Sequence, residues 1–209
     1  MKSEVLALLV HDLKNQLGML EAELGQLAVQ PSAEQAHHAH QHCSQLRQRL
    51  IAYLTLYAVP DRPLTALAED ESPRSFLDRL LRVASRPDGA PLHVGDCANA
   101  PAFWYFDPRL VLLAMEAALH NAWRFARSEV VLNASQQDGF LILSVEDDGM
   151  GLGAPDRSAA SSTGLGTELC AAVAHAHYHG GVHGRVTLNT RAGGGTRFES
   201  RPSPSPAMP

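Results

Sequence analysis

The stretch FLILSVEDDGMG, residues 140–151, contains the pattern that decides the fold. Residues 140–146 are mainly apolar and predict a buried β-strand, which ends where two carboxylates and two glycines follow. Residues 129–134 have a similar strand pattern, and the turn-forming sequence Gln-Gln-Asp-Gly lies between the two segments at 136–139. Together they predict a β-hairpin that leads directly into a polar, glycine-rich segment.

Helices and strands alternate on both sides of this hairpin. The strongest predicted helix covers residues 107–127, because Asp107 is a favourable N-cap and Pro108 suits the first helical position. Residues 202–209 are rich in Pro and Ser, which predicts a disordered tail. The mixture predicts an α+β fold. The other predicted elements are helices at 75–84 and 164–178, strands at 91–94, 102–106, 185–189 and 196–200, and a polar loop at 151–163.

Two amphipathic helices are predicted before residue 60, followed by a proline-containing linker at 59–68. Apolar residues recur at alternating steps of four and three, a heptad seam typical of helices that pack along other helices. Ser32 and Gln35 resemble a capping box at the start of the second helix. Two such helices cannot bury both seams alone, so we expect a four-helix bundle formed by two copies. The seam positions are Leu6, Val10, Leu13, Leu17, Leu20, Leu24 and Leu27, and then Ala36, Ala39, Cys43, Leu46, Leu50, Tyr53 and Tyr57.

Composition excludes several classes of function. The formal net charge is -5 with no basic block, which argues against nucleic acid as a partner. No apolar run approaches the roughly 20 residues that a membrane-spanning helix needs. The three cysteines are far apart in the sequence, which fits a reducing compartment better than a disulfide framework. These features predict a cytoplasmic protein.

Three glycine-rich segments stand out, at residues 147–151, 163–166 and 193–196. Glycine allows backbone amides to approach a ligand closely. The second segment opens a predicted helix, whose free N–H groups suit a phosphate. Asp147 ends the central strand and can accept a hydrogen bond from a neutral donor such as an exocyclic amine. Each segment alone is an ordinary turn, but the three in this order favour a binding site.

In this order and spacing, these motifs resemble those of histidine kinases, from His11 to about Phe198. The resemblance implies a Bergerat-type ATPase domain, an α/β sandwich with helices on one face of a mixed sheet. It also implies ATP and Mg²⁺ as ligands and a response-regulator receiver domain as partner. The matching segments are 11–15 (His-Asp-Leu-Lys-Asn, the H box), 116–122 (Glu-Ala-Ala-Leu-His-Asn-Ala, the N box), 147–151 and 162–166 (the two glycine boxes), and 179–181 with 193–198 (the end of the ATPase domain).

The first helix carries the chemistry that the H box implies. His11 lies beside the seam positions Val10 and Leu13 and therefore faces solvent, and an imidazole is a competent nucleophile toward phosphorus. The resemblance makes His11 the phospho-acceptor and Asp12 its hydrogen-bond acceptor or base. Asn15, one turn further on, is implied to position a water that hydrolyses the phospho-aspartate of the regulator.

The resemblance also assigns the nucleotide site. Asn121 becomes the Mg²⁺ ligand, and Arg124 on the same helix can face the phosphates. Ala117 stands where the family commonly has a second metal-binding side chain, and Thr167 replaces the usual leucine after the second glycine box. We expect these departures to affect autophosphorylation more than nucleotide binding. The other residues assigned to the nucleotide are Asp147, Gly149, Gly151, Thr163, Gly164, Leu165, Gly166 and Thr196.

The sequence therefore favours a histidine kinase with dimerisation and phosphotransfer helices at 1–60 and an ATP-binding domain at 69–201. We expect it to phosphorylate His11, to transfer the phosphoryl group to a regulator, and also to act as the regulator's phosphatase. Only ten residues precede His11, so a separate sensor protein or a larger chain is expected to supply the input. One alternative is a phosphotransferase with a degenerate ATPase domain, which Ala117 favours. Another is a non-enzymatic ATPase-like binding module, which the H box argues against.

The remaining features have simpler interpretations. His38 and His42 have a spacing that can chelate a metal, but a solvated helix is the simpler explanation for this histidine cluster. Cys43 lies on the predicted seam and is expected in the core. Trp104 and Trp123 are also predicted to be core residues.

Overall fold

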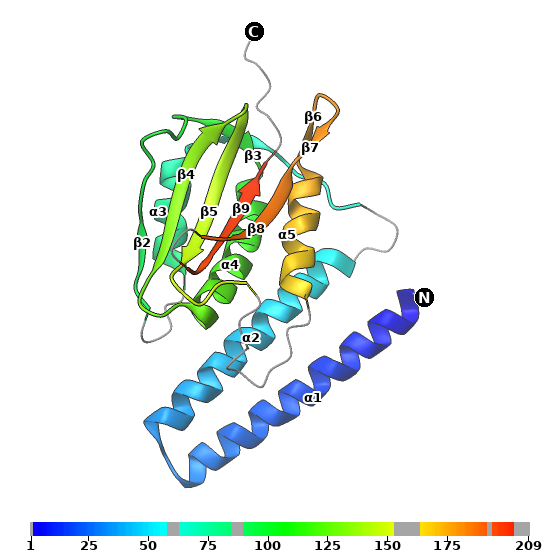
Figure 1. Cartoon of the computed structure of the whole chain (residues 1–209). Coiled ribbons are helices and arrows are strands. Elements are labelled where there is room, and N and C mark those ends of the chain that lie inside the picture. The colour runs from blue at the N-terminus through cyan, green and yellow to red at the C-terminus, as the bar shows by residue number, and fades with distance from the viewer. Residues whose placement is uncertain (1, 58–62, 85–89, 153–163, 192–193, 203–209) are drawn as a thin grey trace. The chain divides into compact units, whose positions relative to one another are not determined.

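The computed structural model describes residues 2–57, 63–84, 90–152, 164–191 and 194–202, with side chains in the first helix described from Val10 onward. The chain divides into two compact units, Met1–Arg62 and Pro63–Pro209 (Figure 1). None of the described helices is long and apolar enough to cross a lipid bilayer.

The first unit is a helical hairpin of α1 (Lys2–Val29) and α2 (Ala33–Tyr57). Ser32 Oγ accepts a hydrogen bond from the backbone N–H of Gln35 at 3.4 Å, which confirms the N-cap half of the predicted capping box. The described part of each helix matches its prediction to within a few residues.

The heptad seam of this hairpin separates into two faces. On α1, Leu20 is 6% exposed, whereas Leu17 and Leu24 are 50% and 52% exposed. On α2, Ala39 and Tyr53 are buried, whereas Leu50 is exposed. Residues seven apart therefore share a face, and the single hairpin covers only one of the two faces. The prediction that Cys43 is a core residue is wrong for this hairpin, since Cys43 lies on the uncovered face, seven residues before Leu50.

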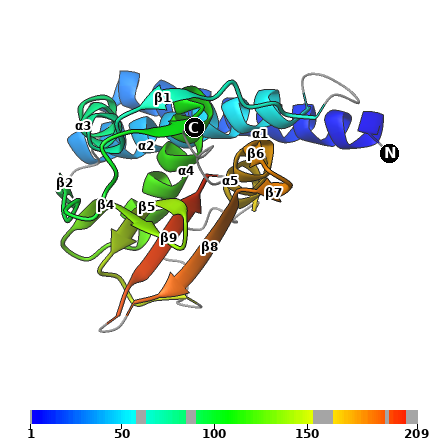
Figure 2. The ribbon, with the colours of Figure 1, turned by 90° about the horizontal axis from the view of Figure 1, so that it is seen from above.

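The second unit is built on a five-stranded sheet with the order β2-β4-β5-β9-β8, in which β2 runs parallel to β4 and the other neighbours are antiparallel. Its three helices lie together on one face of the sheet (Figures 1 and 2). Two small antiparallel pairs, β1-β3 and β6-β7, complete it. The helices are α3 (Pro73–Val83), α4 (Pro108–Phe125) and α5 (Leu165–Ala176), and the strands are β1 (Glu69–Glu71), β2 (Leu92–Val94), β3 (Trp104–Phe106), β4 (Val130–Gln137), β5 (Phe140–Asp147), β6 (Tyr178–His179), β7 (Val182–His183), β8 (Arg185–Thr190) and β9 (Thr196–Arg201).

The predicted hairpin is present but tighter than the sequence suggested. β4 continues to Gln137 and β5 begins at Phe140, so only Asp138 and Gly139 form the turn. Both turn residues have positive φ, 51° and 76°, which matches the twist of the flanking strands. β5 therefore runs for eight residues and delivers Asp147 at its end.

The core of this unit lies between the helices and the sheet. Phe76 of α3 and Met115 of α4 are fully buried against Leu132 and Leu143 of the two long strands. Trp104 is buried as predicted, and Trp123 is a partly buried side chain packed against the core. The resulting two-layer unit confirms the predicted α+β fold, with a helical hairpin followed by an α/β sandwich.

Helix boundaries follow from their caps. The predicted N-cap Asp107 accepts hydrogen bonds from the N–H groups of Arg109 and Leu110, at 3.0 and 3.2 Å. Ser72 caps α3, which begins two residues before the predicted start. The predicted helix at 164–178 ends earlier, because Tyr178 pairs in β6. The predicted loop at 151–163 lies almost entirely outside the described residues, as does the tail beyond Pro202.

Candidate functional site

A buried carboxylate lies at the C-terminal end of β5. The side chain of Asp147 is 1% exposed, and its Oδ1 accepts a hydrogen bond from the N–H of Gly149 at 2.8 Å. Thr196, at the start of the neighbouring strand β9, donates to the same carboxylate from both its N–H and its hydroxyl. An ionised carboxylate has about four acceptor positions, so it can still accept a hydrogen bond from a ligand.

Two glycines allow the chain to close around this carboxylate. A Cβ at Gly149 would lie 2.3 Å from the carbonyl oxygen of Phe125 and 2.8 Å from Asp147 Oδ1. A Cβ at Gly195 would lie 2.0 Å from the carbonyl oxygen of Asp147, and Gly195 also has a φ of +86°. Any other residue would crowd the Asp147 carboxylate from position 149 or the Asp147 backbone from position 195.

The adjacent acidic residue has a different role. Asp148 accepts hydrogen bonds from the N–H groups of Arg127, Ser128 and Glu129 and from the Ser128 hydroxyl. Burial tends to raise the pKa of Asp148, but these hydrogen bonds outweigh it and hold the pKa far below its ordinary value. Asp148 therefore fixes the connection between α4 and β4, and only Asp147 remains as the candidate ligand-binding carboxylate.

The second glycine box lies beside the N box. Gly164, with a φ of +70°, is the N-cap of α5. A Cβ at Gly166 would lie 3.9 Å from the Cβ of Ala117 on α4, so the first turn of α5 meets this part of α4. Asn121 follows Ala117 by one turn and its side chain is exposed. Amide N–H groups at the start of α5 and the Asn121 side chain are the groups here that can interact with phosphates or a metal.

Three further residues that the sequence assigned to the nucleotide lie in the described part of the chain. The side chain of Leu165 is 6% exposed and packs into the protein, so only its backbone can contact a ligand. The Arg124 guanidinium carbon lies 5.6 Å from the centre of the Phe125 ring. Gly151 adjoins the end of β8, where a Cβ would come within 3.1 Å of the Thr190 methyl group. Thr163 lies outside the described residues.

In the first unit, His11 is exposed and has Asn15 beside it. Asn15 Nδ2 lies 3.3 Å from His11 Nδ1, which brings together two of the predicted residues. Asp12 instead reaches α2, where its Oδ2 lies 3.7 Å from Arg49 Nη1. Burial raises the pKa of the Tyr53 hydroxyl, and the negative charge of Asp12 raises it further. The side chain of Asp12, the residue after His11, therefore faces the second helix.

The histidine cluster of α2 contacts α1 through one carboxylate. His42 Nδ1 lies 3.2 Å from each carboxylate oxygen of Glu23, and His38 Nδ1 lies 3.8 Å from one of them. Among the residues that the structure describes, no group of three or more His, Cys, Asp or Glu side chains is arranged to hold a metal ion. The cluster thus serves as a polar contact between the two helices.

Sequence reasoning missed two basic residues near the predicted sites. Arg49 pairs with Asp12, and Arg191 donates to the carbonyl oxygen of Asp147 at 2.9 Å. Neither belongs to a recognisable motif, and both contacts span many residues of the chain. The one signal available for Arg191 was its position two residues before the third glycine-rich segment.

The fold and this arrangement define a two-layer α/β domain that follows a helical hairpin in the sequence. Residues 106–205 match the family model described as "Histidine kinase-, DNA gyrase B-, and HSP90-like ATPase". A comparison with curated protein sequences found no significant match.

Solved structures with a similar fold include the histidine kinase AdeS of Acinetobacter baumannii, with a TM-score of 0.62 and 19% sequence identity. That similarity covers 92% of this chain and 97% of the AdeS chain in the solved structure. The ATP-binding domain of PrrB from Mycobacterium tuberculosis matches with a TM-score of 0.49 and 22% identity, over 67% of this chain and 98% of the domain. The match to the ATPase family model is thus confined to residues 106–205, and the chain shares the fold of the AdeS structure.

Proposed function

We propose that this protein is a histidine kinase that transfers the γ-phosphoryl group of ATP to His11 and then to an aspartate of a response-regulator receiver domain. The observation that carries the proposal is the buried Asp147 carboxylate, held by Thr196 within an ATPase-family domain. The same chain presents His11 on an exposed helical surface beside Asn15. We assign phosphotransfer and dimerisation to residues 1–60 and ATP binding to residues 69–201.

The nucleotide is held by groups from both layers of the domain. Asp147 accepts a hydrogen bond from the exocyclic amine of adenine, because its carboxylate is preorganised by fixed donors and retains acceptor capacity. The phosphates meet the N-terminal turn of α5 at Gly164 and Gly166, where amide N–H groups have no partner within the helix. We include Thr163 and Gly151 in the same binding surface.

A magnesium ion fits this donor set with few protein ligands. Asn121 offers an exposed amide oxygen on α4, while the Ala117 methyl group one turn earlier offers no ligand. Mg²⁺ commonly keeps several waters and takes one or two protein ligands, so the site tolerates the absence of a ligand atom at Ala117. When bound, the ion neutralises charge on the phosphate oxygens. Arg124 lies on the same helix and adds a positive charge near them.

At His11, the chemistry needs one ring nitrogen with a free lone pair. That nitrogen attacks the γ-phosphorus while the bond from phosphorus to the bridging oxygen breaks and ADP leaves. A carboxylate oxygen of the receiver's aspartate then attacks the same phosphorus, while the phosphorus–nitrogen bond breaks and the imidazole of His11 leaves. We assign Asp12 as the hydrogen-bond acceptor or base for the ring. We assign Asn15, whose amide nitrogen lies 3.3 Å from His11 Nδ1, to orient the water that later hydrolyses the phospho-aspartate.

The uncovered seam supports a homodimer. Val10, Leu17 and Leu24 recur every seven residues on α1 and are half or more exposed in the single hairpin. Leu50 and Leu54 of α2 are also exposed. A second hairpin of the same chain has the matching pattern and would bury these rows in a four-helix bundle.

Incubation with γ-labelled ATP and Mg²⁺ tests the proposal. Wild-type protein should acquire an acid-labile, base-stable phosphate, and His11→Ala and Asn121→Ala should each abolish it. Ala117 favours one second candidate, a phosphotransferase that receives phosphate without using ATP. That candidate requires no label from ATP, but labelling of His11 by a phosphorylated receiver domain.

A further inference from the structure

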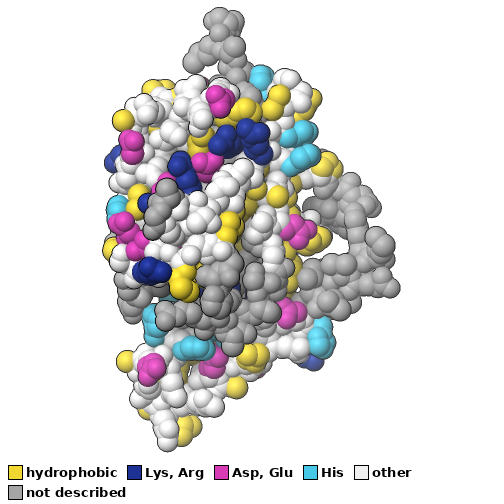
Figure 3. Space-filling model, viewed as in Figure 1, with side chains coloured by type: hydrophobic (Ala, Val, Ile, Leu, Met, Phe, Trp, Pro, Cys, Tyr) yellow, Lys and Arg dark blue, Asp and Glu magenta, His cyan; other side chains and the backbone are white. Residues whose placement is uncertain are grey.

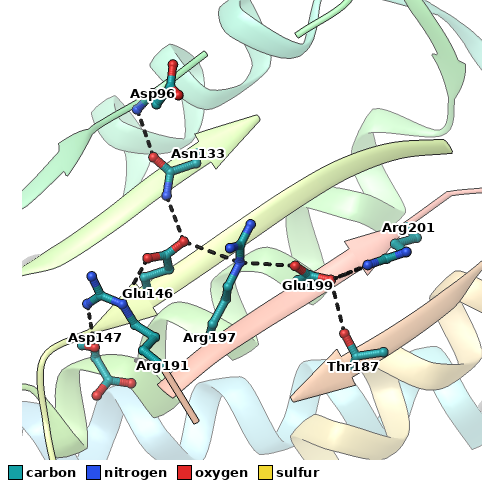
Figure 4. Close-up of polar contacts among 9 residues, drawn as sticks. All are labelled: Asp96, Asn133, Glu146, Asp147, Thr187, Arg191, Arg197, Glu199 and Arg201. Atoms are coloured by element: carbon teal, nitrogen blue, oxygen red, sulfur yellow. Dashed lines mark hydrogen bonds and ion pairs between the residues drawn. The ribbon is translucent and has the colours of Figure 1, made fainter. Parts of the chain in front are cut away.

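Arg191 joins the two segments that form the Asp147 site. Its side chain lies across the end of β5, where Nη1 donates to the carbonyl oxygen of Asp147 at 2.9 Å. Its Nε lies 3.0 Å from Oε2 of Glu146, the preceding residue of the same strand (Figure 4). Glu146 is 13% exposed and Arg191 is 30% exposed, so this pair is more shielded than an ordinary surface ion pair.

The backbone of Arg191 is fixed to the segment that leads into β9. Its N–H donates to the carbonyl oxygen of Gly195 at 3.1 Å, and the N–H of Gly194 donates to the Arg191 carbonyl oxygen at 3.2 Å. Thr196 follows Gly195 directly and supplies the hydroxyl that holds Asp147. Arg191 therefore contacts Asp147 through its side chain, and through its backbone it contacts Gly194 and Gly195, the two residues before Thr196.

The peptide of Asp147 has little freedom between these contacts. Its carbonyl oxygen is packed so closely against Gly195 that a Cβ there would lie only 2.0 Å away. Arg191 donates a charge-assisted hydrogen bond to that same oxygen, and such bonds are stronger than neutral ones. The carbonyl group and the side chain of Asp147 belong to one residue. A shift of this peptide would therefore also move the carboxylate relative to Thr196.

We propose that Arg191 is a positioning residue of the nucleotide site, which holds the Asp147 carboxylate where it meets the exocyclic amine of adenine. This inference rests on the proposed function, since it assumes that Asp147 reads the base. In this role, Arg191 itself contacts neither the base nor the phosphates. It acts through the Asp147 peptide, so its loss should reduce discrimination between bases.

Arg197 provides a matched control. Its Nε lies 3.3 Å from Oε1 of the same Glu146 and 3.0 Å from Oε1 of Glu199, without hydrogen-bond geometry to either. Both arginines belong to the charged network on the face of the sheet opposite the helices, where basic and acidic side chains lie side by side (Figures 3 and 4). The ion pairs of Arg197 involve Glu146 and Glu199, whereas Arg191 also reaches Asp147.

Calorimetric titration of the full chain with ATP and with inosine triphosphate tests the role of Arg191. Inosine has an oxygen where adenine has the exocyclic amine, so the ratio of the two affinities reports on the Asp147 contact. Arg191→Ala should bind ATP about tenfold more weakly and lose most of the preference for ATP, as expected for loss of a well-placed hydrogen bond to a charged group. Arg191→Lys should be intermediate, because an ammonium can reach one of the two partners. Arg197→Ala should keep the wild-type ratio.

The outcomes separate this inference from the proposal on which it depends. Wild-type protein that binds both nucleotides equally, or neither, overturns the assignment of Asp147 as the base-reading residue. A wild type that prefers ATP, together with an Arg191→Ala variant of unchanged ratio, overturns the role of Arg191 alone. An equal loss of preference in Arg197→Ala also overturns it, since the effect would then belong to the whole charged network. If circular dichroism shows that Arg191→Ala is unfolded, Arg191→Lys decides, and an unchanged ratio there overturns the inference.

Discussion

The backbone N–H of Asp107 donates a 3.0 Å hydrogen bond to Nε2 of His177, across 70 positions of the sequence. The other ring nitrogen, Nδ1, lies 2.7 Å from the carbonyl oxygen of Val173 and therefore carries the ring proton. Asp107 is the N-cap of α4 and His177 is the C-cap of α5. The neutral imidazole thus ties the beginning of one helix to the end of the other.

This contact predicts a pH dependence of stability. Burial lowers the pKa of His177 below its ordinary value of 6.5, more than its hydrogen bond to Val173 and the charge of Asp107 raise it. As pH falls below 6.5, His177 therefore becomes protonated in the unfolded chain while it remains neutral in the folded chain. The free energy of unfolding should be fully retained above pH 6.5 and should fall as pH decreases toward the folded-state pKa.

Chemical denaturation between pH 5 and pH 7.5 measures this effect against His177→Gln, which keeps an acceptor and a donor but does not titrate. Wild type should show the steeper loss toward acid, by at most about 1.4 kcal/mol per pH unit for one proton. Identical slopes for the two proteins would show that His177 does not titrate differently on folding.

A second prediction concerns the uncovered seam of the helical hairpin. Leu17→Asp should dissociate the proposed homodimer, because the interface would lose a leucine that is 50% exposed in the single hairpin and would have to accommodate a charge. Met19→Asp is the control, since Met19 is 58% exposed on the same helix but does not belong to the seam. Multi-angle light scattering at micromolar concentration should give the monomer mass for the first variant and the dimer mass for the second and for wild type. A monomeric wild type contradicts the seam argument.

Some elements of this fold could be predicted because their signals are local. The N-cap at Asp107 and the turn at Asp138-Gly139 each depend on neighbouring residues, and both are present. β1 has the sequence Glu-Asp-Glu, which favours no strand, and it exists because it pairs with β3, far along the chain. The two-residue strands β6 and β7 likewise have too little sequence to show a period.

Some features of the candidate site could likewise be predicted from local sequence, and others could not. Asp147 and its glycines were apparent from the sequence, because a carboxylate at a strand end next to glycine is a local pattern. The sequence could not distinguish Asp147 from Asp148, since the difference arises from which backbone amides each carboxylate meets in the folded chain. The contact of Arg191 with Asp147 depends on the register between β8, β9 and β5, which no local pattern fixes.

The two adjacent aspartates make a matched pair for testing nucleotide binding. Asp147→Asn should weaken ATP binding by roughly 1.5–3 kcal/mol, since a hydrogen bond to a charged group is lost and an amide must face the donors of Thr196 and Gly149. Asp148→Asn should lower thermal stability but leave the affinity for ATP nearly unchanged, because its partners lie in the connection between α4 and β4. Calorimetry that finds equal ATP affinity for Asp147→Asn and wild type would exclude Asp147 as a contact to the nucleotide.

The proposed phosphatase role of Asn15 is testable separately from the proposed phospho-acceptor role of His11. The Asn15–His11 contact is exposed and 3.3 Å long, so its loss should cost less than about 1 kcal/mol. Asn15→Ala should therefore leave labelling of His11 largely intact, but should slow the loss of phosphate from the phosphorylated regulator. Labelling of His11 in the same preparation is the internal control. Equal lifetimes of the phosphorylated regulator with wild type and variant would contradict this role.

The departure at Ala117 predicts a gain of function. Ala117 precedes Asn121 by one turn, and its methyl group faces Gly166, which has no side chain to block a longer residue. Ala117→Asn should restore a second amide ligand and lower the half-saturating Mg²⁺ concentration for His11 labelling by roughly fivefold, which is about 1 kcal/mol. Ala117→Leu has a similar shape without a ligand atom, so it should give no such gain. A gain in Ala117→Leu as large as that in Ala117→Asn would mean that packing against α5, rather than metal ligation, limits the reaction.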